Sequence, residues 1–183
     1  MKVSLENMTR EELWQLFPIF LVPHNMEWGK WFSEEKKSIE TLFPSQKLTI
    51  SHIGSTAVPD IWAKNIVDIL VEVANESAMQ HVKEKLVDNG WICMSESQHR
   101  ISLNKGYTED GFAEKVFHLH LRIFGDNDEI YFRDYLIAHP DIAKEYETLK
   151  LSLWKKFEHD RDGYTEAKGD FIKKYTDIAK KEI

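Results

Sequence analysis

The first 44 residues alternate apolar and polar positions with the period of a helix. After Thr9-Arg10-Glu11-Glu12, which fits a capping box, apolar side chains recur at spacings of three and four at Leu13, Leu16, Phe17 and Phe20. Pro23 is expected to stop this helix. A second helix, capped by Asn25 and broken at Pro44, carries an apolar face expected to lie in the core: Trp28, Trp31, Phe32, Ile39 and Leu42.

The centre of the chain changes to the two-residue period of strands. Residues 66–73 are β-branched and almost continuously apolar, which is typical of a central strand. Ser77 is expected to cap a helix that ends at Gly90, and residues 105–111 form a turn-rich connection. The complete set of expected strands is 48–53, 66–73, 91–94, 100–104 and 116–124.

Helical periodicity returns after Asn127. It predicts one helix that ends at His139-Pro140, a second over 142–153 and a third over about 163–181. Helices, a mixed centre and a helical tail together indicate an α+β fold, with helices packed on a small sheet. A length of 183 residues suits one domain, and we expect residues 1–183 to form it, with a core over about 21–175.

Composition narrows the class of partner. The formal net charge is −7 at pH 7, which argues against nucleic acid and anionic membranes as partners. No apolar run approaches the roughly 20 residues that cross a bilayer, so the expected location is cytoplasmic. The single cysteine, Cys93, sits in an apolar run and is expected to be a small buried core residue. The lysine-rich end, 168–183, is expected to be a solvated helix face.

The stretch Gly54-Ser55 could bind phosphate. Glycine permits a tight turn and a close approach of ligand to backbone, and the Ser55 and Thr56 hydroxyl groups could help the N–H groups hold phosphate oxygens. Asp68 lies in the middle of the next strand and could hold Mg²⁺ or Mn²⁺ beside such a turn. A lone strand aspartate is also a common structural residue, and that reading stays open.

Two histidines share one face of a later strand. His118 and His120 are two residues apart, so both point away from the apolar face of their strand. If that strand neighbours 66–73, one of them comes beside Asp68. His52 is expected to be hydrogen-bonded structure, and Glu72 to face solvent at its strand.

Two basic residues are candidates for neutralising an anion. Lys64 could pair with Asp68 or a phosphate, or could be an ordinary solvated lysine. Arg100 begins a strand and could clamp an anion with two N–H groups, whereas Arg122 is expected to face solvent.

Several segments resemble the GrpB family. The segment HIGSTAVPDIWAKNIVDILVEV is similar to its signature, with Asp60 where the family often has glycine and Asn65 where it often has proline. Further similar segments are PHNMEWGKWF, FHLHL, FRDYLIAHPDIAKEYETLKLSLWKKF and DRDGYTEAKGDFI, so that the resemblance covers about residues 21–175.

This resemblance implies a nucleotidyltransferase-like fold with a small mixed sheet flanked by helices. It implies that Gly54 and Ser55 form the phosphate turn and that Asp68 is the first metal-binding acid. The second acid of that superfamily falls on Leu70, which cannot bind a metal, and the third falls on the strand with His118 and His120. Domains similar to this family also occur fused to dephospho-coenzyme A kinase, which favours a nucleotide or coenzyme A context.

Three functional hypotheses follow. The first is a metal-dependent nucleotidyltransferase-like enzyme, and the second is a binding module for a nucleotide or coenzyme A-like ligand without turnover, motivated by Leu70. The third is a hydrolase with a metal held by histidine and aspartate. The candidate catalytic residues are Asp68, His118 and His120, the candidate metal ligands Asp68 and His120, and the candidate phosphate-binding residues Gly54, Ser55, Thr56, Lys64 and Arg100.

Overall fold

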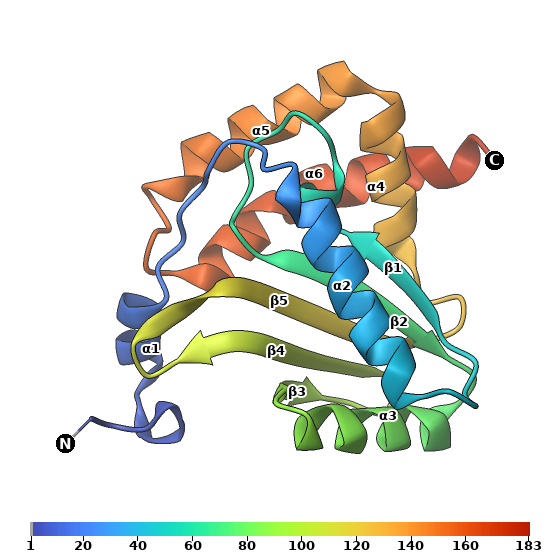
Figure 1. The fold of residues 1–183 in the computed structure, drawn as a ribbon. Coiled ribbons are helices and arrows are strands. Elements are labelled where there is room, and N and C mark those ends of the chain that lie inside the picture. Colours follow the sequence, from blue (N-terminus) through green and yellow to red (C-terminus); the bar gives the residue numbers. More distant parts are fainter. Residues whose placement is uncertain (1) are drawn as a thin grey trace.

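The computed structural model describes residues 2–183, which fold as helices around a central sheet (Figure 1). The strands are β1 (Thr49–Ile53), β2 (Val67–Val73), β3 (Ile92–Glu96), β4 (Arg100–Thr108) and β5 (Gly111–Ile123). The helices are α1 (Arg10–Leu16), α2 (Glu27–Leu42), α3 (Glu76–Asp88), α4 (Asp128–Ala138), α5 (Pro140–Trp154) and α6 (Arg161–Lys181), with single 3₁₀ turns at Leu5–Asn7 and Ser55–Ala57. The α+β prediction with a helical C-terminal tail is confirmed.

The five strands form one mixed sheet in the order β1-β2-β5-β4-β3. Only β2 and β5 run parallel, and the other three pairs of neighbours are antiparallel. The parallel register sets Asp68 opposite His118 and Leu70 opposite His120. The strand with the two histidines is therefore a direct neighbour of 67–73, as the sequence hypothesis required.

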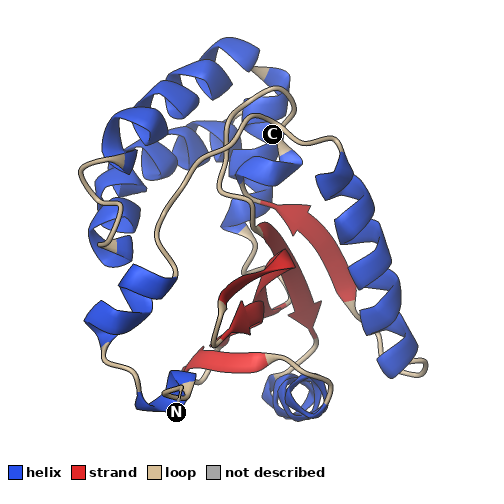
Figure 2. Cartoon of the chain, turned by 60° about the vertical axis from the view of Figure 1, so that its left-hand side comes forward, coloured by secondary structure: helices blue, strands red, loops and turns tan. Residues whose placement is uncertain are grey.

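One face of the sheet holds the main hydrophobic core. Alternate residues of β2 and β5 point to this face, where α2 and α3 cover them (Figure 2). Trp28 and Ile39 of α2 are almost fully buried there, which confirms the expected core face of that helix. The other face of β2 and β5 carries Asp68, His118 and His120, because successive side chains of a strand point to opposite faces.

Helices α4, α5 and α6 form a separate layer above the sheet in Figure 1. Phe132, Leu136, Tyr146 and Tyr175 make a second apolar core between them, and Val58 and Ile61 of the loop after β1 pack into it. This loop therefore runs from the sheet to the helical layer, and it brings Ser55 and Lys64 between the two.

Capping chemistry explains most helix boundaries and corrects two predictions. The capping box at Thr9 and Glu12 forms as expected. The helix ends at Leu16 rather than at Pro23, because Pro18 disfavours helical geometry in the residue before it. Asn75, not Ser77, caps α3: its side chain accepts a hydrogen bond from the Ala78 N–H group.

The sequence underestimated the length of two strands. Residues 105–111 are not a long connection, because β4 continues to Thr108 and β5 begins at Gly111, which leaves only a two-residue turn. Cys93 is exposed, contrary to prediction, since β3 is a short edge strand whose residues all face solvent. No helix in the described chain has both the length and the apolar character to cross a membrane.

Candidate functional site

The turn that leaves β1 is shaped by Asp68. Gly54 has a φ angle of 74°, a conformation that side chains disfavour. A Cβ atom at Gly54 would also lie 2.6 Å from Asp68 Oδ2, which is closer than such atoms approach. Position 54 is therefore a glycine because the backbone at this point passes directly against the Asp68 carboxylate.

Asp68 and the two histidines of β5 come together. His118 Nδ1 lies 3.7 Å from Asp68 Oδ1, and His120 Nε2 lies 3.3 Å from the same oxygen. All three side chains are partly exposed, with 27%, 16% and 27% of the side-chain surface accessible for Asp68, His118 and His120. The group is therefore open to a ligand and is not part of a dry interior.

A hydrogen-bond chain behind His118 fixes where its proton lies. Arg161 Nη1 donates to the Tyr107 hydroxyl oxygen at 2.7 Å. The Asp68 carboxylate can only accept, which favours the His118 proton on Nδ1, so that His118 Nε2 accepts from the Tyr107 O–H group, 2.5 Å away. The proton of a neutral His118 is thus on Nδ1, which faces Asp68. Since a carboxylate only accepts, the His120 Nε2–H group also donates to Asp68, which places the lone pair of a neutral His120 ring on Nδ1.

This environment shifts the pKa values of Asp68 and His118. Burial lowers the pKa of His118 to about 3, although the charge of Asp68 opposes the shift. Burial alone raises the pKa of Asp68, but the hydrogen bond from His120 and the charges of His118, His120 and Lys64 outweigh it and hold that pKa below its usual range. At neutral pH the group is an ionised carboxylate beside a neutral His118.

Three lysines face this group across the cleft. Lys64 comes from the loop after β1, Lys150 from α5 and Lys168 from α6. Within the described residues, no carboxylate lies within 4.0 Å of any of these three ammonium groups. Lys150 is 2% exposed and donates to the Trp62 carbonyl oxygen at 2.5 Å. Aromatic rings line the cluster: Tyr164 lies 4.3 Å from Lys168 and Tyr146 lies 4.9 Å from Lys150, measured from ammonium to ring centre.

The lysines are poorly compensated, and their pKa values reflect this. Burial first, and then the charges of Lys168 and Arg161, lowers the pKa of Lys64 to about 7. Burial lowers the pKa of Lys168 to about 8, and it lowers the pKa of Lys150 well below its ordinary value. Such a cluster is favourable only if an anion enters it, because a bound anion restores the charged state of each lysine.

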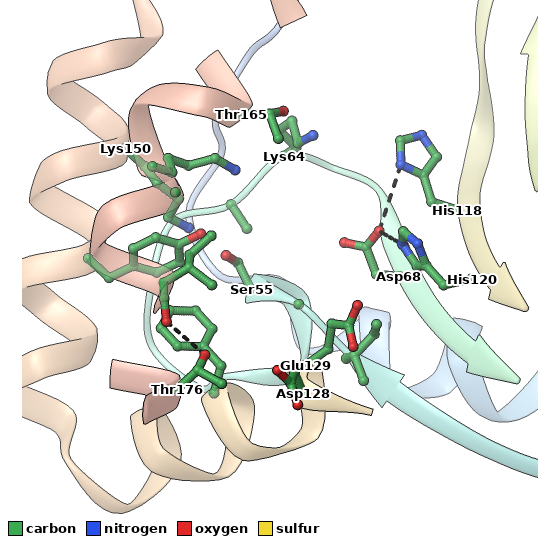
Figure 3. Close-up of a pocket in the computed structure, with 18 of the residues that line it drawn as sticks. Ser55, Lys64, Asp68, His118, His120, Asp128, Glu129, Lys150, Thr165 and Thr176 are labelled. Carbon is green, nitrogen blue, oxygen red and sulfur yellow. Dashed lines mark hydrogen bonds and ion pairs between the residues drawn. The ribbon is translucent and has the colours of Figure 1, made fainter. Parts of the chain in front are cut away.

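The acid group and the lysines line one cavity of about 780 Å³ between the sheet and the helical layer. Figure 3 shows Asp68, His118 and His120 on one wall, with Lys64 and Lys150 across the cavity and Ser55 between them. Asp128, Glu129 and Asp177 also line it. Asp128 and Asp177 pair with Lys180 and Lys173, and Arg122 lies 3.7 Å from Glu129. Among the described residues, the charged side chains of the cavity without an oppositely charged lysine, arginine, aspartate or glutamate partner are therefore the three lysines and Asp68, which has only histidine neighbours.

The candidate phosphate-binding residues have different surroundings. Gly54, Ser55 and Lys64 line the cavity, and Ser55 lies against the Tyr146 phenol. Thr56 is buried, and its hydroxyl group hydrogen-bonds His52 at 2.8 Å, which confirms the structural reading of His52. Arg100 reaches the rim of the cavity, but two of its nitrogens contact Asp126 at 2.8 and 2.6 Å.

Three sequence readings are corrected by the structure. Glu72 is buried and accepts hydrogen bonds from Gly125 N and Asn127 Nδ2, so it fixes the loop after β5 and does not face solvent. Arg122 is buried between Asp126 and Glu129. Leu70 stands at the position of the superfamily's second acid, and it is fully buried on the sheet. Lys168 is not part of a solvated helix face, since it lines the cavity.

The sequence analysis did not single out Lys150, Lys168, Tyr107 or Arg161. These side chains lie on α5, on α6 and on β4, far along the chain from the Gly54-Ser55 turn. The segments that carry Lys150 and Lys168 did match the quoted family patterns, and their conspicuous aromatic neighbours Tyr146 and Tyr164 were the available signal. No local pattern shows that these lysines point inward.

The donor set limits what metal the site could hold. The described residues contain no group of three histidine, cysteine, aspartate or glutamate side chains placed to hold a metal ion. Asp68 offers one carboxylate, and His120 Nε2 is occupied by its hydrogen bond to that carboxylate. The chain alone therefore lacks the several oxygen ligands that Mg²⁺ requires, and a cation could fit only with oxygens from a ligand.

The fold and this cleft define an α+β protein with a lysine-lined cavity between the sheet and the helical layer. The model of the GrpB protein family matches residues 18–177, and the chain belongs to this family. The crystal structure of the conserved protein GrpB from Enterococcus faecalis superposes with a TM-score of 0.77 and 29% identity, and covers 89% of this chain and 98% of that chain. Family membership confirms the resemblance, and the GrpB crystal structure shares the α+β fold of this chain.

Curated relatives agree on the family. The glutamate-rich protein GrpB of Alkalihalophilus pseudofirmus is 36% identical over 159 residues, which are 84% of this chain and 91% of that protein. UPF0157 protein YqkA of Bacillus subtilis is 31% identical over 92% of this chain, but the chain spans only 50% of YqkA. A dephospho-CoA kinase of Mycolicibacterium paratuberculosis is 24% identical over 82% of this chain, which spans 43% of that protein.

Proposed function

We propose that the cleft binds a nucleoside triphosphate or a similar phosphorylated small molecule, in a nucleotidyltransferase-like protein. The observation that carries this proposal is the cluster of Lys64, Lys150 and Lys168, three half-buried or buried cations without a carboxylate partner in the described chain. A polyphosphate would supply the missing charge. The cavity of about 780 Å³ falls within the roughly 300–1,000 Å³ typical of small-molecule sites.

The phosphates would lie between the lysines and the Gly54-Ser55 turn. Gly54 has a positive φ angle and no side chain, so the Asp68 carboxylate lies directly against its backbone, and a phosphate at this turn would lie beside that carboxylate. Lys150 is held by the Trp62 carbonyl group, so it is pre-oriented before a ligand arrives. Arg100, which already contacts Asp126, would act at the rim and not at the phosphates.

Mg²⁺ or Mn²⁺ would be shared between Asp68 and the ligand. Mg²⁺ in phosphate sites is commonly bound by one or two carboxylates together with phosphate oxygens. One carboxylate suffices for that arrangement, whereas a site made by the chain alone needs more donors than it has. The cation would supply charge neutralisation for the phosphates. A metal hydrolase with a histidine-held ion lacks its ligand set, so this hypothesis is not retained.

Group transfer would use His120. Its Nε2–H group donates to Asp68, which leaves Nδ1 with a lone pair that can take a proton from an acceptor hydroxyl group. His118 would keep Asp68 in place, with its own proton fixed by Tyr107 and Arg161. The buried Leu70 removes the second acid and favours the alternative of a nucleotide or coenzyme A-binding module without turnover.

Calorimetry with ATP, GTP, CTP, UTP and coenzyme A tests the binding proposal. We expect one nucleotide at least to bind with Mg²⁺ or Mn²⁺ present, and Lys168→Met to weaken that binding at least tenfold. Lys174→Met on the same helix is the matched control, since Lys174 is exposed and should leave affinity unchanged. Absence of heat with every ligand and either metal would refute the proposal.

Asp68→Asn separates the enzyme from the binding module. If the chain transfers a nucleotidyl group, pyrophosphate release should be lost in Asp68→Asn and strongly reduced in His120→Gln. If the chain only binds, the wild-type protein should retain ligand without releasing pyrophosphate, and Asp68→Asn should only remove the effect of Mg²⁺ on affinity. The two outcomes differ in the wild-type protein itself.

A further inference from the structure

A second hollow adjoins the cleft. It measures about 280 Å³ and shares Lys64 and Ile66 with the larger cavity. Its apolar wall comes from Phe20 after α1 and from Phe112 at the start of β5, whose ring centres lie 6.0 Å apart, and from Pro18, Ile66 and Val116. Phe20 and Ala113 are exposed, so the hollow opens to solvent.

Arg161 provides an unusual polar group in this hollow. Its Nη1 atom donates to Tyr107, but its Nε and Nη2 atoms are buried and have no hydrogen-bond partner among the described residues. Among the described residues, no carboxylate lies within 4.0 Å of the Arg161 guanidinium group. The Nε–Nη2 edge of an arginine accommodates a carboxylate or phosphate through two parallel hydrogen bonds. Both atoms have almost no accessible surface here, so an anion in the hollow would reach them only with a small shift of the side chains that cover them. Leaving this edge empty is costly, because a buried charge without a partner destabilises the fold.

The charge balance of the hollow favours an anion. Lys64 and Arg161 are its cations, and the charge of Arg161 contributes to the lowered pKa of Lys64. Glu114 is the one acid among the residues that line it, and this residue is exposed on β5. An anionic group near Lys64 and Arg161 would compensate both cations, while an apolar body could pack against Phe20 and Phe112.

We propose that this second hollow binds a second small molecule, with a planar apolar body and a carboxylate or phosphate group that pairs with Arg161. Its volume suits a molecule of about ten non-hydrogen atoms, well below a nucleotide. Lys64 lies in both linings, so this molecule would stand beside the phosphates of a nucleotide in the cleft. A role of this second molecule as the acceptor in group transfer rests on the proposed function, but its binding in the second hollow does not.

Phenyl phosphate and phenylacetate are suitable probes, with phenylacetamide as the neutral control. We expect both anions to bind at least tenfold more tightly than the amide in calorimetry. They should also shift the Arg161 Nε–H signal in ¹H–¹⁵N spectra. Arg161→Gln should abolish the difference between anion and amide. Both anions are tested because they share the chemistry that Arg161 would bind.

Ala113→Leu provides an independent test of the second hollow, because Ala113 is exposed and lines this hollow but not the larger cavity. It should weaken the binding of phenyl phosphate at least tenfold and leave nucleotide binding unchanged, whereas Ala113→Ser should affect neither. The proposal is overturned if phenyl phosphate binding survives Ala113→Leu but is lost in Lys168→Met, or if the amide binds as well as the anions. Probe binding without any nucleotide binding would refute the proposed function and the acceptor role alone.

Discussion

Gly54 is the residue at which the site and the backbone constrain each other most. Gly54→Ala would place a Cβ atom 2.6 Å from Asp68 Oδ2 on a backbone with φ of 74°. We expect it to lower the free energy of unfolding by about 1–3 kcal/mol, because strained backbone and a displaced carboxylate both contribute. Urea denaturation measures this. Gly29→Ala, where no atom lies within 4 Å, should instead stabilise α2 by about 0.5–1 kcal/mol. Equal effects of the two substitutions would contradict the prediction.

Asp60 shows the same constraint without a glycine. It has a φ angle of 62° and stands where the family often has glycine. This backbone conformation explains why glycine suits the position. Asn65 likewise has a structural role, since its side chain accepts a hydrogen bond of 2.8 Å from the buried Trp28 indole. Both departures from the family pattern are therefore compatible with the fold.

A strand pattern predicts the position of some residues of the candidate site but not of others. Asp68, His118 and His120 lie on alternating positions of two strands, so their common face was predictable once the strands were neighbours. Lys150 and Lys168 lie on helices whose approach to the turn depends on packing through the second apolar core. Arg161 reaches Tyr107 across 54 positions of the chain, and no local signal encodes that contact.

At the scale of elements, α5 holds the loop that carries Lys64. Glu147 accepts a hydrogen bond from the Trp62 N–H group at 2.6 Å, and Lys150 donates to the carbonyl group of the same residue. Lys144 adds a bond to the Asp60 carbonyl oxygen at 2.5 Å. Two polar groups of one loop residue are thus fixed by successive turns of one helix. Loop and helix should therefore respond to substitution as a unit.

Glu147→Ala should loosen this loop. It leaves the Trp62 N–H group without its charged partner, and we expect a loss of about 1.5–3 kcal/mol in unfolding free energy. The amide of Trp62 should exchange with solvent faster, and the affinity for a phosphorylated ligand should fall because Lys64 is no longer held. Hydrogen exchange and calorimetry check this. Glu145→Ala on the exposed side of α5 is the control. A protected Trp62 amide in Glu147→Ala would contradict the prediction.

The predicted boundaries of strands and helices were wrong where features other than hydrophobic periodicity decided them. The strand 67–73 was recognisable because it is continuously apolar, and α6 because its pattern is long. The outer part of the β4–β5 hairpin was missed, since the glycines and polar residues of 105–111 indicated a turn, whereas Tyr107 and Phe112 pair across the two strands. Edge strand β3 looked buried for its composition, yet an edge position leaves Cys93 in solvent. Solvent exposure follows from strand order, which the sequence did not reveal.

For the whole molecule, the overall charge conceals the charge of the cleft. The net charge of −7 suggests a protein that repels anions, yet Lys64, Lys150 and Lys168 meet in one cavity. Sequence order spreads these residues over more than one hundred positions, so a charge count cannot detect their cluster. The acidic composition still argues against long polyanions, and the enclosed cavity selects a small phosphorylated molecule instead.

The cluster should give the free protein an unusual dependence of stability on pH. The pKa of Lys64 is lowered to about 7 and that of Lys168 to about 8, while unfolded lysines titrate near 10.5. Between these values the unfolded chain binds more protons than the folded chain, so the free energy of unfolding must rise with pH. Burial raises the pKa of Tyr146 and Tyr164, so deprotonation of unfolded tyrosines reverses the trend above about pH 10.

We therefore expect urea midpoints of the free protein to increase from pH 7 to about pH 9.5, despite its growing negative charge. Lys64→Met with Lys168→Met should reduce this increase, because two of the three lysines that bind protons on unfolding are gone and Lys150 remains. A saturating phosphorylated ligand should reduce it as well, since phosphate restores the ordinary pKa of both lysines. Lys174→Met should leave the slope intact. Midpoints that fall steadily above pH 7 in the free protein would show that the lysines are solvated and charged, and the anion site would lose its physical basis.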